Sequence, residues 1–180
     1  MVVEDGTGKV DANSLVSVAF ADTYFSERLN TAWGLLTTEV KEASLIKATD
    51  YFEVRFGNSL LGSRMYPDNP QALSFPRVDS NGSVIGTTIY DVDNVTIIGY
   101  DSPTMIKRAI CEYAIRASSG SLIKDISSDA LLSSRVKVGN IEKETNFTQN
   151  TRRPDLYNTY PLADGMVKPY LKSSSGQVIR

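Results

Sequence analysis

The side chains that most often carry out chemistry are sparse in this sequence, and none of them completes a catalytic motif. The sequence has no histidine, so the commonest general base and the commonest metal ligand are both absent. Its single cysteine, Cys111, lies within an apolar stretch, where we expect a buried and unreactive thiol. Serines are plentiful, but none follows the G-x-S-x-G pattern of a nucleophile beside a base. We therefore expect no enzymatic activity, no catalytic residue and no cofactor.

Two short segments contain part of a ligand-binding pattern. An extended backbone would place the carboxylates of Asp91 and Asp93 on one face, where they might ligate a hard cation, but the glycine and the distal glutamate of an EF-hand loop are missing. We favour a solvated turn for them. Residues 6–9 (GTGK) resemble a fragment of a phosphate-binding loop, yet they lack its full spacing and follow no predicted strand. We predict neither a metal site nor a nucleotide site.

Length and composition indicate one globular domain. The chain of 180 residues is long enough to bury a core, and its net charge of -2 gives no general argument for binding nucleic acid. A single cysteine excludes an intrachain disulfide and fits a reducing compartment. The sequence contains no apolar run of about 18 residues, so we expect no association with a membrane.

The clearest predicted element is a helix over residues 102–118, SPTMIKRAICEYAIRAS. Ser102 is a suitable N-cap, Pro103 suits the first helical position, and Gly120 can end the helix in a left-handed conformation. Apolar side chains recur at the three- and four-residue spacing of a buried stripe, at Ile106, Ala109, Ile110, Tyr113 and Ala117.

Other segments fit a mainly α fold, a small bundle of three or more helices with a short β-hairpin, long loops and terminal arms. We predict helices over residues 17–29, capped by Ser17, and over residues 37–56, capped by Thr37 or Thr38. A connector with the only tryptophan, Trp33, separates them.

The remaining elements are shorter. Residues 86–101 are rich in β-branched side chains and predict one or two strands, and residues 135–146 predict a hairpin with its turn at Gly139-Asn140. A short helix is expected within residues 161–171. In terms of domains, we expect an N-terminal arm (1–14), a single helical domain (15–171) and a polar C-terminal tail (172–180).

Basic residues are the remaining candidates for a functional surface. They occur on the central helix and on the predicted hairpin, at Lys107, Arg108, Arg116, Arg135 and Lys137. Ordinary solvated faces are one interpretation, and a stripe that meets phosphates is the other. Binding of single strands normally adds exposed aromatic platforms, whereas the aromatic residues here fall mostly at core spacing.

Several segments over residues 15–171 together form a pattern that matches a known family. These segments are Ser17-Val18-Ala19, Asp22, Tyr24-Phe25, Arg28-Leu29, Lys41-Glu42-Ala43, Leu45-Ile46, Ala48-Thr49, Gln71 to Arg77, Gly82, Pro103, Ile106-Lys107, Ala109, Glu112, Ala114, Lys137-Val138-Gly139 and Ile141-Glu142. In their order and spacing they resemble the tailed-phage head-to-tail connector family, also called adaptor or head-completion proteins, and related proteins described as DnaT-like and single-stranded-DNA-binding. In the QALSFPR segment, relatives commonly carry Trp in place of Phe75, and residues 86–101 are longer than the family pattern.

The resemblance implies a structural virion protein without catalysis. Copies of the chain would form a ring, of twelve in this family, beneath the portal protein at the head–tail interface of a virion assembled in the host cytoplasm. The ring would extend the channel for double-stranded DNA and join the next neck or tail protein. The alternative implied by the second family label is a replication accessory protein that binds single-stranded DNA.

The resemblance also gives roles to particular residues. The five basic residues listed above become expected channel or subunit contacts. The C-terminal segment becomes an expected portal contact, through Tyr170, Leu171, Lys172, Val178, Ile179 and Arg180.

Overall fold

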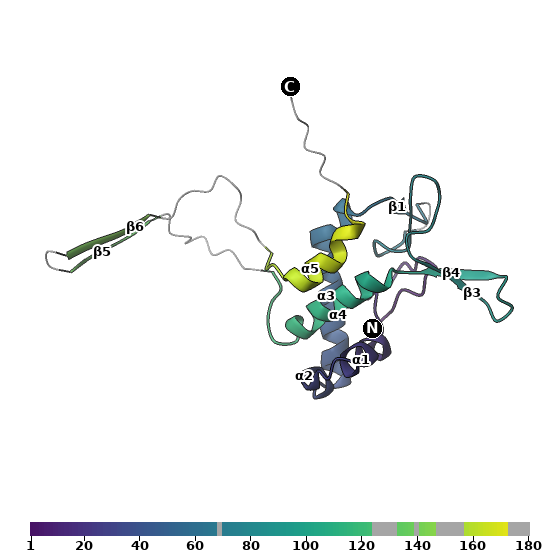
Figure 1. Ribbon diagram of the computed structural model, residues 1–180, viewed down its shortest axis with the longest axis horizontal. Coiled ribbons are helices and arrows are strands. Elements are labelled where there is room, and N and C mark those ends of the chain that lie inside the picture. The colour runs from purple at the N-terminus through teal and green to yellow at the C-terminus, as the bar shows by residue number, and fades with distance from the viewer. Residues whose placement is uncertain (68–69, 124–132, 139–140, 147–156, 173–180) are drawn as a thin grey trace, which may run out of the picture. The chain divides into compact units, whose positions relative to one another are not determined.

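The computed structural model describes residues 1–67, 70–123, 133–138, 141–146 and 157–172. The chain divides into two units (Figure 1). One consists of Met1–Leu122 with Thr159–Arg180, and the other of Ile123–Asn158.

Helices make up the body of the first unit, which confirms the predicted mainly α fold (Figure 1). The long helix α3 packs against α4, and α4 packs in turn against α5. Aromatic and branched side chains fill the space between them. The helices are α1 (Val18–Ser26), α2 (Thr31–Gly34), α3 (Thr38–Phe56), α4 (Thr104–Ala117) and α5 (Pro161–Val167), with single 3-10 turns at η1 (Gly57–Ser59) and η2 (Lys168–Tyr170).

Side-chain caps set the starts of the first three helices. Ser17 accepts a hydrogen bond from the Phe20 amide at 3.2 Å, and Thr37 accepts one from the Val40 amide at 3.4 Å. Both caps and the end of α3 at Phe56 confirm the sequence prediction. The segment predicted as a connector contains α2, which is capped by Asn30.

The central helix α4 differs at both ends from its prediction. It begins at Thr104, with Pro103 as N-cap, and Ser102 lies buried one residue earlier without capping the helix. Gly120 does not adopt the predicted left-handed conformation, because Ser118 continues the right-handed turn and its amide bonds to the Ala114 carbonyl at 3.0 Å. The predicted apolar stripe is buried throughout.

Short antiparallel strand pairs complete the described residues. The pair β3 (Thr87–Tyr90) and β4 (Ile97–Asp101) confirms the strands predicted over 86–101. In the second unit, β5 (Ser133–Val138) and β6 (Ile141–Asn146) confirm the hairpin, and its predicted turn at 139–140 lies outside the described residues. We did not predict the pair formed by β1 (Ser63–Arg64) and β2 (Arg77–Val78).

We expected residues 1–14 to be an N-terminal arm. Instead, backbone contacts join the beginning of this segment to its end. Val3 forms a parallel bridge with Ser14, and the Glu4 amide donates to the Ser14 carbonyl at 2.9 Å. Within the part of the chain that the structure describes, no helix has both the length and the apolar character needed to cross a membrane.

Candidate functional site

The outer end of the β3–β4 hairpin exposes a group of large apolar side chains, some wholly and some by about half. We call residues 90–98 the hairpin tip. Figure 1 shows the hairpin extending away from the helices. Its exposed large apolar side chains are Tyr90 (50%), Val92 (96%), Val95 (78%), Ile97 (48%) and Ile98 (51%). Several large apolar side chains exposed at one end of a hairpin make that end a candidate site of protein contact.

Two carboxylates hold the turn of this hairpin in shape. Asp93 accepts hydrogen bonds from the amides of Val95 and Thr96 at 2.9 and 2.8 Å, and from the Thr96 hydroxyl at 2.6 Å. These bonds, with the Thr96 hydroxyl contributing most, lower the pKa of Asp93. Asp91 accepts from the Val92 amide at 2.7 Å. The structure thus confirms a turn for the two aspartates.

The two carboxylates of this turn are engaged by the turn itself. Because Asp91 and Asp93 accept from their own turn, they are not arranged as a pair of free ligands. Over the described residues as a whole, no group of three or more Cys, Asp or Glu side chains is placed to hold a metal ion.

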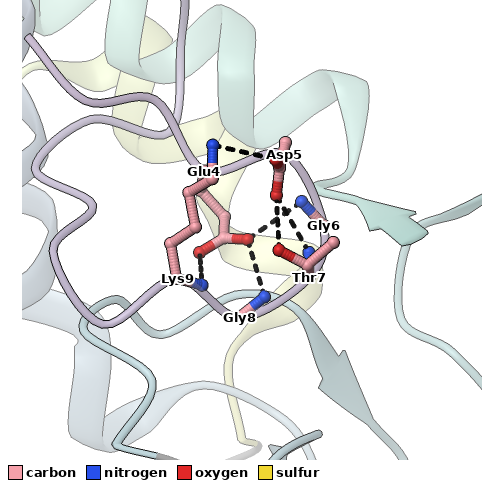
Figure 2. A network of polar contacts seen from close by, with 6 residues as sticks. All are labelled: Glu4, Asp5, Gly6, Thr7, Gly8 and Lys9. Carbon is pink, nitrogen blue, oxygen red and sulfur yellow. Dashed lines mark hydrogen bonds and ion pairs between the residues drawn. The ribbon is translucent and has the colours of Figure 1, made fainter. Parts of the chain in front are cut away.

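The base of the hairpin rests on a loop built around Glu4, which we call the Glu4 loop (residues 4–9; Figure 2). One carboxylate oxygen of Glu4 accepts from the amides of Gly6 and Gly8, both at 2.9 Å, and the other accepts from the amide of Lys9 at 3.0 Å. Asp5 bonds to the Thr7 hydroxyl at 2.7 Å and pairs with the Lys9 ammonium at 2.8 Å. Glu4 itself is only 8% exposed. Its desolvation is therefore offset by three hydrogen bonds to a charged acceptor.

Two glycines allow this loop to approach its neighbours. Gly6 and Gly8 have φ angles of +92° and +74°, which residues with a Cβ rarely adopt. A Cβ on Gly6 would lie 2.4 Å from the Tyr100 nitrogen, and one on Gly8 would lie 2.3 Å from the Tyr66 ring. The Gly6 carbonyl accepts from the Tyr100 amide in β4 at 3.0 Å. The Glu4 loop is thus hydrogen-bonded to β4 at the end of the hairpin opposite the hairpin tip.

The Glu4 loop also accounts for the GTGK segment. Its backbone amides converge on an anion, as those of a phosphate-binding loop do, but the anion is the carboxylate of Glu4.

The basic residues of α4 lie in different surroundings. Lys107 pairs with Asp101 and lies 4.8 Å from the centre of the Phe20 ring. Arg116 pairs with Glu112 at 2.8 Å. Arg108 has no ion pair among the described residues and lies beside α1 in a shallow pocket. These three side chains therefore do not form one free cationic surface.

The other two basic candidates belong to the second unit. In the register of its hairpin, Arg135 is opposite Glu144, and Lys137 is opposite Glu142.

The C-terminal segment expected to contact a portal lies partly within the described residues. The Tyr170 carbonyl accepts from the Leu61 amide, and the Lys172 amide donates to the Ser59 carbonyl, both at 2.8 Å. Leu171 forms a bridge with Leu60. Val178, Ile179 and Arg180 lie outside the described residues.

Over residues 1–180 the chain matches the family described as "Putative DnaT-like ssDNA binding protein". The chain belongs to this DnaT-like family. No curated protein and no solved structure gives a significant match. The family is the second of the two to which the sequence bears a resemblance.

Proposed function

We propose that this member of the DnaT-like family is a structural virion protein, a head-to-tail adaptor of tailed phages that joins the portal to the neck or tail. The observation that supports this most is the hairpin tip. Val92 and Val95 are 96% and 78% exposed, yet their turn is fixed by Asp93 and the hairpin base by the Glu4 loop. An ordered apolar projection is suited to binding another protein, because little conformational entropy is lost on contact.

The arrangement of the cations supports a channel lining rather than a tight nucleic-acid binder. Lys107 and Arg116 are already paired with carboxylates, as are Lys41 with Asp22 and Arg55 with Asp164. Each phosphate that a protein neutralises strengthens the contact and makes it salt-sensitive. A wall of paired cations would let double-stranded DNA pass.

The partners in this proposal are further copies of the chain in a ring, the portal protein and the next neck or tail protein. Size measurements test it, with the protein alone and mixed with portal, by sedimentation and electron microscopy. We expect rings attached to portal. A chain that stays monomeric in the presence of portal would refute the proposal.

The hairpin tip provides a sharper version of the same experiment. Replacing Val92 and Val95 together by serine removes apolar surface without touching the carboxylates of the turn. We expect this variant to lose attachment to portal or to other copies. Val54→Ser is the matched control, because Val54 is 62% exposed on α3. If the two variants behave alike, the tip has no role in assembly.

Single-stranded-DNA binding is the second candidate, and the family description favours it. Arg108, which lines a pocket beside α1, would be its first phosphate contact. Fluorescence anisotropy with a labelled oligonucleotide at several salt concentrations tests it. Tight binding by a monomer, weakened in Arg108→Gln but not in Lys47→Gln, would support this function and count against the adaptor.

A further inference from the structure

A polar pocket of about 320 Å³ opens beside the β1–β2 pair, and we call it the Arg77 pocket. Three cations line it, Arg64 from β1, Arg77 from β2 and Lys172, together with the carboxylate of Glu53 from α3. The ion pairs found among the described residues include none of these three cations. With Glu53 ionised, three cations and one carboxylate give the pocket a net charge of +2.

The two arginines of this pocket are opposite each other in the β1–β2 pair. In the register of these strands, Arg64 is the direct partner of Arg77. Like charges at directly opposite positions destabilise a strand pair. Burial lowers the pKa of the Arg77 guanidinium, and the charge of Glu53 opposes this change whereas that of Arg64 adds to it. The protomer thus holds two cations close together without giving either one an ion pair among the described residues.

Arg77 is only 6% exposed, and backbone carbonyls fix the position of its guanidinium. Its Nε donates to the Leu61 carbonyl at 2.7 Å, and its Nη2 donates to the carbonyls of Gly62 at 2.7 Å and Leu60 at 3.4 Å. Its Nη1 donates to the Ser74 carbonyl at 3.3 Å. Since a guanidinium has five N–H groups, one N–H of Nη1 has no acceptor within the part of the chain that the structure describes. A donor held in this way loses little conformational entropy when it binds an anion.

The other two cations lie on the exposed side of the pocket. Arg64 donates to the Gln71 carbonyl at 3.0 Å, and the Lys172 ammonium donates to the Asn58 carbonyl at 3.5 Å. Each of these cations has further N–H groups besides the one used in that bond. The exposed side therefore keeps donors for a ligand that enters from solvent.

We propose that the Arg77 pocket binds a phosphate group. Arginine suits phosphate because its planar fork can donate two parallel hydrogen bonds to the oxygens, and lysine adds a point charge. Arg64 and Lys172 hold the phosphate from the exposed side, and Arg77 holds it from the buried side. The bound anion also offsets the repulsion between the two arginines. This inference goes beyond the proposed function and does not depend on it.

The carboxylate of the pocket is held by Ser74 rather than by the cations. Glu53 accepts from the Ser74 amide at 2.9 Å and also from the Ser74 hydroxyl. Its negative charge opposes the binding of an anion without blocking the donors of Arg64 and Lys172. Removal of that charge should therefore strengthen phosphate binding, which provides a test of opposite sign to the loss of a cation.

Isothermal titration calorimetry of the full chain with inorganic phosphate, at constant ionic strength, tests the site. Arg64→Gln should weaken binding by about tenfold, the effect of losing one hydrogen bond between charged groups. The variant should stay folded, because it also removes a like-charge contact with Arg77. Lys47→Gln is the matched control, since Lys47 is an exposed cation on α3 outside the pocket. A wild type that does not bind phosphate, or equal losses in the two variants, would overturn the inference.

Glu53→Gln separates a loss of binding from a loss of structure. Glutamine keeps an oxygen that can accept from Ser74 but carries no charge, so this variant should bind phosphate several-fold more tightly than the wild type. Weaker binding in Glu53→Gln, like that in Arg64→Gln, would place the anion elsewhere and refute the site.

Competition identifies the source of the phosphate group. A labelled oligonucleotide that inorganic phosphate displaces, and that Arg64→Gln binds more weakly, would identify a nucleic-acid backbone as the source. Binding of inorganic phosphate without competition by the oligonucleotide would identify a free phosphate or a small phosphorylated molecule. Either result supports the pocket. Attachment to portal is measured separately, so failure of the adaptor function would leave this inference intact.

Discussion

Arg55 and Asp164 form a two-point ion pair that joins α3 to α5 across 109 residues of sequence. The two guanidinium nitrogens each lie 2.9 Å from a different carboxylate oxygen. Asp164 also accepts from the Tyr113 hydroxyl at 2.7 Å and from the Tyr160 amide at 3.1 Å. Burial, followed by the bond to Asp164, raises the pKa of Tyr113, so its hydroxyl remains a donor at physiological pH. One carboxylate thus links three helices.

We predict that Asp164→Asn lowers the free energy of unfolding by about 2 kcal/mol, because it leaves a half-buried Arg55 without its counter-charge. Urea denaturation measures the change. Glu27→Gln is the control, since Glu27 pairs with Arg28 at the surface, and its effect should stay within about 0.5 kcal/mol. Equal effects of the two substitutions would mean that the pair does not join the helices.

A second prediction concerns the Glu4 loop. Glu4→Ala removes the acceptor for three amides and should destabilise the protein by about 2 kcal/mol, with the loss concentrated at the hairpin base. Hydrogen exchange should accelerate at the Tyr100 amide, which bonds to Gly6, more than at the α4 amides. Asp11→Ala serves as control, because Asp11 is exposed and lies within residues 1–14 but outside the Glu4 loop. Unchanged exchange at Tyr100 would show that the loop does not support the hairpin.

A third prediction uses the pH dependence of stability. Burial raises the pKa of Glu53, although Ser74 donates to its carboxylate from both the amide and the hydroxyl. As pH rises above 4.5, the ordinary pKa of a glutamate, Glu53 loses its proton in the unfolded chain before it does so in the folded protein. The folded state therefore binds more protons, and the free energy of unfolding should fall as pH rises from 4.5 through the raised pKa of Glu53. Glu53→Gln should lack this component. If wild type and variant keep a constant difference in urea midpoint from pH 4 upward, Glu53 does not titrate abnormally.

A fourth prediction concerns Cys111. Burial raises the pKa of its thiol to about 12, and the side chain is fully enclosed in α4. Iodoacetamide at neutral pH should leave the folded protein unlabelled and modify it completely in urea, as measured by mass spectrometry. Rapid labelling of the folded protein would show that α4 opens on the timescale of the reaction.

Local patterns in the sequence were enough to predict most helices. Ser17 and Thr37 act as caps because a hydroxyl at the start of an apolar periodic stretch has amides of the first turn to accept from. The predicted start of α4 was wrong by one residue, because Ser102 and Pro103 both suit the start of a helix. Tertiary packing, which buries Ser102, decides between them and is not visible in the local sequence.

The sites depend on contacts between distant parts of the chain, which periodicity does not reveal. The GTGK segment resembled only a fragment of a phosphate-binding loop, and its role depends on Tyr100, which lies far away in the sequence. The exposed apolar tip could be suspected only from the unusual length of residues 86–101. The Arg77 pocket could not be predicted either, because it depends on the pairing of β1 with β2.

The carboxylate inside the Glu4 loop has a consequence for ligands. Because Glu4 is tethered two residues from Gly6, its carboxylate is always present at those amides, and a free anion would have to compete with an intramolecular one. A nucleotide would have to displace a charged group that the chain itself always supplies. The segment is therefore an anion cradle occupied by a side chain of the same loop, and its amides serve to order the N-terminal segment.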